Sequence, residues 1–66
     1  MKIADSVLMF YSRSLNTLYL LNLRTNDEVK IKDKSARKIY NMLKKGKKYN
    51  VDVSELLKMG FIDDKQ

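Results

Sequence analysis

The sequence predicts an α+β fold, a three-stranded antiparallel meander with two C-terminal helices packed on one face. Three observations predict it: two β-rich runs flank a short polar loop, a third run alternates strictly, and two later segments carry apolar residues at helical spacing. At 66 residues without proline or a Gly/Ser tract, the chain is expected to form a single small domain over residues 1–66, with fraying at residues 63–66.

The first two predicted strands form a hairpin. Residues 6–11 and 17–23 are rich in Val, Leu, Phe, Tyr and Thr, and residues 12–16 between them have the length of a hairpin loop. The first strand is apolar on both faces, and two short helices cover only one face of a sheet. A homodimer that covers the other face is therefore one hypothesis.

The third predicted strand follows a polar break at residues 24–27. Residues 28–32 alternate between polar and apolar, which turns Val29 and Ile31 inward. The opposite face is charged, and this suits either a protected sheet edge or a surface for an anionic partner.

The first helix is predicted after that strand. Asp33 or Ser35 can cap its start, and Gly46 offers a left-handed exit. Its inward stripe recurs at i, i+3, i+4 and i+7 and consists of Ala36, Ile39, Tyr40 and Leu43.

The second helix is predicted over residues 53–59. Asp52 and Glu55 have the spacing of a capping box, and Gly60 lies where a Schellman ending needs positive φ. Phe61 is then placed to return to the core or the sheet.

Positive charge is concentrated between residues 30 and 48. The chain has a formal net charge of +6, and this segment contains nine cations with Asp33 as its sole acid. Such a field attracts nucleic acid, anionic lipid or acidic peptide alike. Lysines near a helix end also favour the macrodipole, and Tyr49 can either stack on a base or cover the core edge. The candidate anion or nucleic-acid contacts are Arg37, Lys38, Lys44, Lys45, Lys47, Lys48 and Tyr49.

The composition argues against an enzyme. Without Cys or His, the chain lacks thiol nucleophiles, the commonest metal ligands and the commonest neutral-pH base. Its glycines do not form a phosphate loop, so we expect neither cofactor nor metal. No apolar run approaches the roughly 20 residues of a membrane span, and the N-terminus does not resemble a signal peptide, so we expect a cytoplasmic protein without a membrane partner.

A family resemblance adds to this interpretation. The segments Leu-Leu-Asn-Leu at residues 20–23, Val29 and Ile31, residues 35–46, and Leu-Leu-Lys-Met-Gly-Phe-Ile at residues 56–62 are arranged in the order of a known domain. The chain resembles the PqqD-like RiPP recognition element, a winged-helix-type domain that binds the leader peptides of modified natural products. The likeness covers about two thirds of the chain.

The resemblance implies where a peptide would lie. In that family the leader adds as a strand beside the third strand and packs against the last helix. The family has three helices after the hairpin, whereas residues 47–51 leave one of them without a counterpart. The peptide contacts implied here are Glu28, Lys30, Lys32, Leu56 and Met59.

Three functions follow as expectations, none of them enzymatic. The first is a module that binds a protein or acidic peptide through a strand edge and a basic helix face. The second is a non-specific nucleic-acid-binding regulator, since lysine gives point-charge contacts rather than bidentate base recognition. The third is a small inhibitor, encoded by a mobile element, that docks on a host protein.

Overall fold

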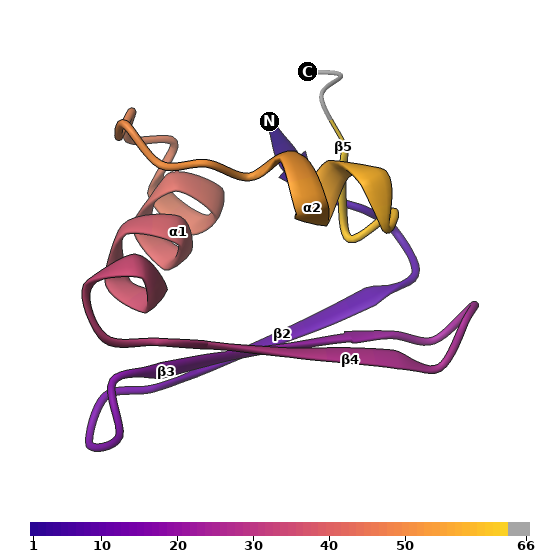
Figure 1. The fold of residues 1–66 in the computed structure, drawn as a ribbon, viewed down its shortest axis with the longest axis horizontal. Helices are drawn as coiled ribbons and strands as arrows, with labels where there is room; N and C mark the ends of the chain where they lie inside the picture. Colours follow the sequence, from indigo (N-terminus) through magenta and orange to yellow (C-terminus); the bar gives the residue numbers. More distant parts are fainter. Residues whose placement is uncertain (64–66) are drawn as a thin grey trace.

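A three-stranded antiparallel sheet is the base of the molecule. The computed structural model describes residues 1–63. Strands β2 (Val7–Ser12), β3 (Thr17–Asn22) and β4 (Asp27–Lys32) lie in the order β2-β3-β4, and α1 (Asp33–Lys45) lies over one face of the sheet (Figure 1). The predicted α+β class and meander are confirmed. Helix α2 (Ser54–Lys58), on the same side of the sheet, has five residues.

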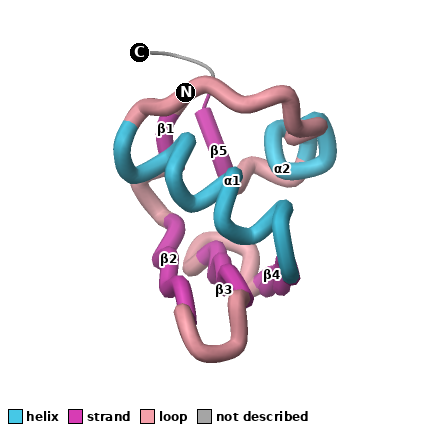
Figure 2. The backbone as a smooth tube through the Cα atoms, turned by 90° about the vertical axis from the view of Figure 1, so that its left-hand side faces the viewer, coloured by secondary structure: helices cyan, strands magenta, loops and turns pink. Residues whose placement is uncertain are grey.

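A second, two-stranded sheet lies beside the helices, on the same side of the three-stranded sheet. Strands β1 (Lys2–Ile3) and β5 (Ile62–Asp63) pair antiparallel, with Ile3 opposite Ile62 (Figure 2). The sequence did not predict this pairing, because two-residue strands carry no periodicity. The predicted fraying of residues 63–66 is wrong for Asp63, which pairs with Lys2. The rest of that prediction concerns residues 64–66, which lie outside the described residues.

The strand register separates an inner face from an outer face. Met9 is opposite Leu20, and Leu20 is opposite Val29, so these three side chains share the face turned towards the helices. Val29 and Ile31 are half-buried there, as predicted. The core between sheet and helices consists of Val7, Leu18, Leu20, Ala36, Ile39, Val53, Leu56, Phe61 and Ile62.

Helix α1 has the predicted stripe and the predicted end. Ala36 and Ile39 are buried, Tyr40 and Leu43 are half-buried, and Gly46 ends the helix with φ of 71°. The predicted side-chain cap is wrong. Asp33 itself has φ of 63° and donates its N–H to the Asn16 carbonyl at 2.9 Å, so a tertiary bond to the β2–β3 loop sets the turn into the helix.

Helix α2 has the predicted Schellman ending. The N–H of Phe61 donates to the Leu56 carbonyl at 2.9 Å, the N–H of Gly60 donates to the Leu57 carbonyl at 3.2 Å, and Gly60 has φ of 79°. The predicted capping box is wrong, because Val53 occupies the N-cap position without a side-chain bond.

The carboxylate of Asp52 instead holds the residue that starts α2. Its Oδ1 accepts hydrogen bonds from the Ser54 hydroxyl at 2.7 Å and the Ser54 N–H at 3.0 Å. The hydroxyl bond, followed by the backbone bond, lowers the pKa of Asp52 below its ordinary value.

We expect acid to loosen the start of α2. A pKa lowered by folding means that the ionised carboxylate stabilises the fold; this contribution is complete above the ordinary pKa and is lost as pH falls through the lowered value. The Ser54 amide resonance should therefore titrate below about pH 4. In Asp52→Asn, which keeps an Oδ1 acceptor, that titration should disappear. A Ser54 titration that persisted in this variant would assign it to another group.

Candidate functional site

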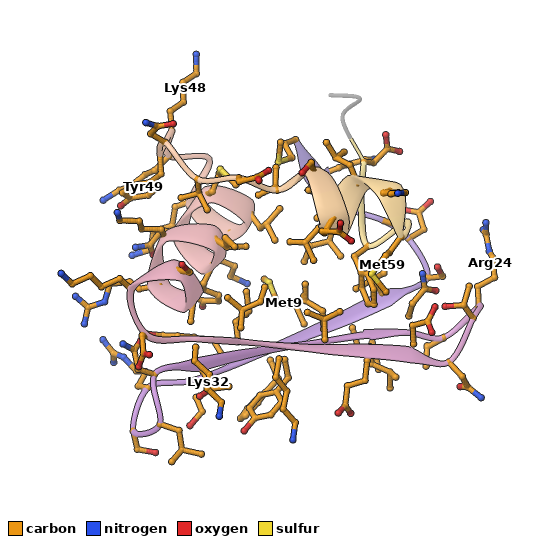
Figure 3. The ribbon with its side chains drawn as sticks, viewed as in Figure 1. Met9, Arg24, Lys32, Lys48, Tyr49 and Met59 are labelled. Carbon is orange, nitrogen blue, oxygen red and sulfur yellow. The ribbon has the colours of Figure 1, made fainter. Side chains whose placement is uncertain are left out.

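Cations gather at the end of the molecule where α1 lies. Arg37 and Lys45 are exposed, and with the half-buried Asn41 they follow one another at intervals of four residues along one face of the helix. Figure 3 shows nitrogen-tipped side chains around α1, while Arg24 lies at the opposite end. We call this surface the basic flank, formed by Arg13, Lys34, Arg37, Lys38 and Lys45.

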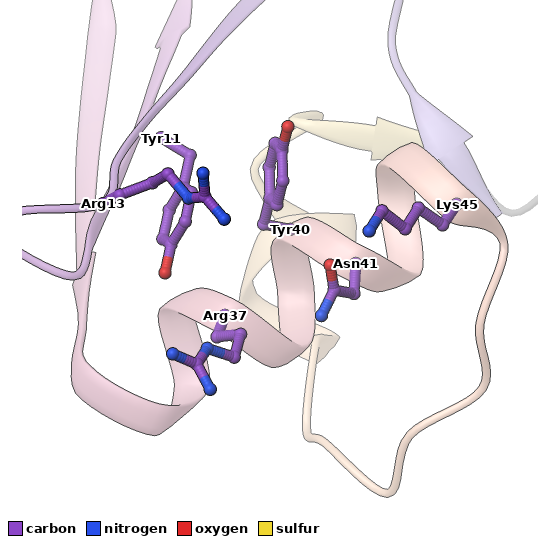
Figure 4. Close-up of a pocket in the computed structure, with 6 residues that line it drawn as sticks. All are labelled: Tyr11, Arg13, Arg37, Tyr40, Asn41 and Lys45. Carbon is purple, nitrogen blue, oxygen red and sulfur yellow. The ribbon is translucent and has the colours of Figure 1, made fainter.

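A hollow of about 570 Å³ opens between the β2–β3 hairpin and α1. Tyr11 and Arg13 line it from the hairpin, and the other lining side chains come from the helix (Figure 4). Of the residues that the structure describes, no acidic one lines it. We call this hollow the basic pocket; it is lined by Tyr11, Arg13, Arg37, Tyr40, Asn41 and Lys45.

Two stacked tyrosines connect the walls of the basic pocket. The rings of Tyr11 and Tyr40 have centroids 4.7 Å apart and planes inclined by 17°. The Tyr11 hydroxyl donates to Asn16 Oδ1 at 2.7 Å, which fixes this ring against its own loop. Both side chains are half-buried, so the aromatic wall is held by packing on one side and faces solvent on the other.

Two neighbouring hollows extend the basic surface along α1. One, of about 310 Å³, is lined by Asn16, Lys34, Arg37, Lys38 and Tyr49, so Arg37 belongs to it and to the basic pocket. The other, of about 330 Å³, contains Lys47, Lys48 and Tyr49. The structure thus brings most of the predicted anion contacts together. Lys44 is exposed and lines none of these three hollows.

The pocket has the chemistry of an anion site. Among residues 1–63, the side chains of Arg13, Arg37 and Lys45 make no hydrogen bond or ion pair with one another or with any neighbour. A guanidinium group offers paired N–H donors that match the two oxygens of a carboxylate or phosphate. Two such groups and an ammonium, beside an aromatic wall, can hold either anion.

The predicted peptide edge lies on β4, which pairs only with β3 among the described strands. In an antiparallel ladder, bonded and non-bonded pairs alternate. The backbone N–H of Asp33 donates to the Asn16 carbonyl, so this pair is a bonded one and every second residue back along β4 is also bonded to β3. The N–H and C=O groups of the residues between them, Glu28, Lys30 and Lys32, therefore point away from β3.

The predicted helical side of the peptide site needs a correction. Leu56 is 6% exposed and belongs to the core, so it offers a peptide almost no surface. Met59 is exposed, as is Leu57, which the sequence analysis did not select. The Schellman ending turns Leu56 inward towards Phe61, and the adjacent Leu57 therefore points to solvent.

The basic pocket contains four residues that were not among the contacts predicted from the sequence: Tyr11, Arg13, Asn41 and Tyr40, the last assigned to the core. The four-residue spacing of Arg37, Asn41 and Lys45 was a detectable signal. Arg13 lines the pocket only because the hairpin packs beside α1, and no local sequence pattern predicts that position.

Comparison with protein-family models, with curated proteins and with solved structures yields no match. None of the helices within residues 1–63 is long and apolar enough to cross a bilayer. The same residues contain no group of three or more carboxylates that could hold a metal ion.

Proposed function

We propose that this chain is a small non-enzymatic binding protein that holds an extended acidic segment of another protein. The observation that carries the proposal is the free edge of β4, whose outward backbone groups belong to Glu28, Lys30 and Lys32. An added strand can satisfy these groups by β-augmentation.

The charges beside this edge favour an acidic partner. Strand β4 ends at Lys32, and α1 begins at Asp33 with the first residues of the basic flank. A segment paired with β4 would therefore continue onto Lys34, Arg37 and Lys38, whose charges attract carboxylates. The winged-helix-like docking implied by the family resemblance would add the exposed Met59 to this surface.

A proline substitution tests the edge. Lys30 N–H points away from β3, so Lys30→Pro should remove a donor needed by an added strand while leaving the β3–β4 ladder intact. We expect it to weaken binding of a synthetic peptide of alternating Glu and Val at least tenfold, measured by titration of amide NMR resonances.

Lys30→Ala is the matched control, because it removes the same charge and keeps the N–H. It should retain most of the affinity, and an unchanged amide spectrum elsewhere would show that both variants fold. If Lys30→Pro bound the peptide as tightly as Lys30→Ala, pairing along β4 would be excluded.

A second candidate, binding of single-stranded nucleic acid, is favoured by the stacked pair of Tyr11 and Tyr40 within the basic pocket. Cations that follow a phosphate backbone beside aromatic rings are typical of such binders. The proposal differs from β-augmentation because it requires the two arginines of the pocket and not the edge of β4.

A further inference from the structure

The outer face of the three-stranded sheet is apolar and uncovered by the described chain. Leu8 and Phe10 are 57% and 65% exposed, although both belong to a strand. Tyr19 and Leu21 lie opposite them on β3 and are half-buried. Figure 1 shows the helices on the other side of the sheet only. A contiguous apolar face of this kind marks an interaction surface.

Charges occupy only one margin of this face. Glu28, Lys30 and Lys32 follow one another along β4, opposite Leu21, Tyr19 and Thr17. The outer face therefore has an apolar part on β2 and β3 and a charged row on the edge strand, with the acid at one end and a lysine at the other.

We propose that two copies of this chain pack outer face against outer face. The two-fold axis lies between the sheets and runs perpendicular to the strands. This rotation places β2 over β2 and β4 over β4 in reversed direction. Phe10, Tyr19 and Lys30 lie level with the axis, so Phe10 meets Phe10 of the second copy and Leu8 lies over Ser12 of the second copy. Glu28 meets Lys32 of the second copy at both ends of the charged row.

The positions of the charges on the outer face favour this arrangement over the other two-fold arrangement of the same faces. A two-fold axis parallel to the strands would place β2 over β4 and bury Phe10 against Lys30, leaving charges without partners. In the proposed arrangement the charged row stays at the rim. Lys30 faces Lys30 of the second copy across the axis, and at the rim solvent screens these two charges. Its Nζ is 5.9 Å from the Tyr19 ring centroid within its own copy.

The size of the face sets the expected affinity. A standard interface buries about 800 Å² per partner, roughly a sixth of the 4999 Å² surface of this chain. Three strands of six residues span only about 20 by 14 Å. The interface is therefore at the small end of the range, and we expect dimers to dissociate at micromolar concentration.

Analytical ultracentrifugation at protein concentrations between about 1 and 500 µM, a range that brackets the expected dissociation constant, tests dimerisation through the outer face. The wild type should shift from monomer to dimer, and Leu8→Glu should remain monomeric throughout. Leu57→Glu makes the same chemical change on α2, on the other side of the sheet, and should dimerise as the wild type does. A wild type that is monomeric at every concentration, or a dimer that tolerates Leu8→Glu, would overturn the proposal.

A charge exchange tests the alignment. Glu28→Lys should weaken the dimer at least tenfold, because two lysines then face each other at each end of the row. Adding Lys32→Glu should restore it. The control Glu28→Lys/Lys58→Glu has the same net charge, but its acid lies on α2 and should not restore dimers. Equal recovery in both double variants would overturn the antiparallel alignment.

Discussion

Replacing Phe61 by alanine is expected to lower the free energy of unfolding by about 3 to 5 kcal/mol. The Phe61 side chain is completely buried and is among the largest in the core, where the sheet and both helices meet. A small domain has a total stability of about 5 kcal/mol or little more, so the variant should retain little stability and unfold at a much lower urea concentration than the wild type. Urea denaturation followed by circular dichroism measures the change.

Phe10 provides the matched control, because it is the only other phenylalanine of the chain. It is 65% exposed and contacts Tyr19 with ring centroids 6.0 Å apart. Phe10→Ala should cost about 1 kcal/mol or less when measured at concentrations where the chain is monomeric. If the two substitutions cost the same, Phe61 would not be the centre of the core.

The sheet could be predicted because its signals are local. The two strands of the hairpin, the alternation in residues 28–32 and the inward Val29 and Ile31 depend only on neighbouring residues, and the structure confirms them. The hairpin loop is one residue shorter than predicted, because Ser12 belongs to β2 and the loop covers residues 13–16. The pairing of β1 with β5 joins the two ends of the chain, so no short window of sequence contains it. Long-range pairing of two-residue strands is set by the packed core and not by propensity.

Helix ends were predicted where backbone conformation decides them. Gly46 and Gly60 adopt the positive φ that their positions require. Helix starts were not predicted. The backbone N–H of Asp33 donates to the Asn16 carbonyl, and its φ of 63° places this residue outside the usual N-cap conformation. The Asp52 carboxylate accepts hydrogen bonds from Ser54, so neither carboxylate caps a helix in the predicted way.

The sequence predicted the positive charge of the candidate site but not its position on the molecule. The segment from residue 30 to residue 48 divides between two surfaces, with Lys30 and Lys32 on the outer sheet face and the others around α1. Only the packing of α1 against the hairpin brings Arg13 and Tyr11 to Tyr40. Charge in the sequence therefore predicts an anionic ligand, and tertiary structure adds the aromatic wall.

Replacing Arg13 and Arg37 by alanine is expected to reduce binding of a single-stranded oligothymidylate more than tenfold at low salt. Each phosphate contact to a single strand contributes about 0.7 to the slope of log affinity against log salt, so losing two contacts should reduce that slope by about 1.4. Both side chains line the basic pocket and have no partner within residues 1–63, so their removal should not disturb the fold. Fluorescence anisotropy at several salt concentrations gives both quantities.

The control removes two positive charges from other parts of the molecule. Arg24 lies at the far end of the molecule and Lys58 on α2, both exposed, so Arg24→Ala/Lys58→Ala should keep the slope within experimental scatter. Equal loss in both variants would show that net charge, and not the basic pocket, attracts the strand. If the wild type bound no oligothymidylate at low salt, where electrostatic attraction is strongest, nucleic-acid binding would be excluded and the basic flank would be left to carboxylates of a protein partner.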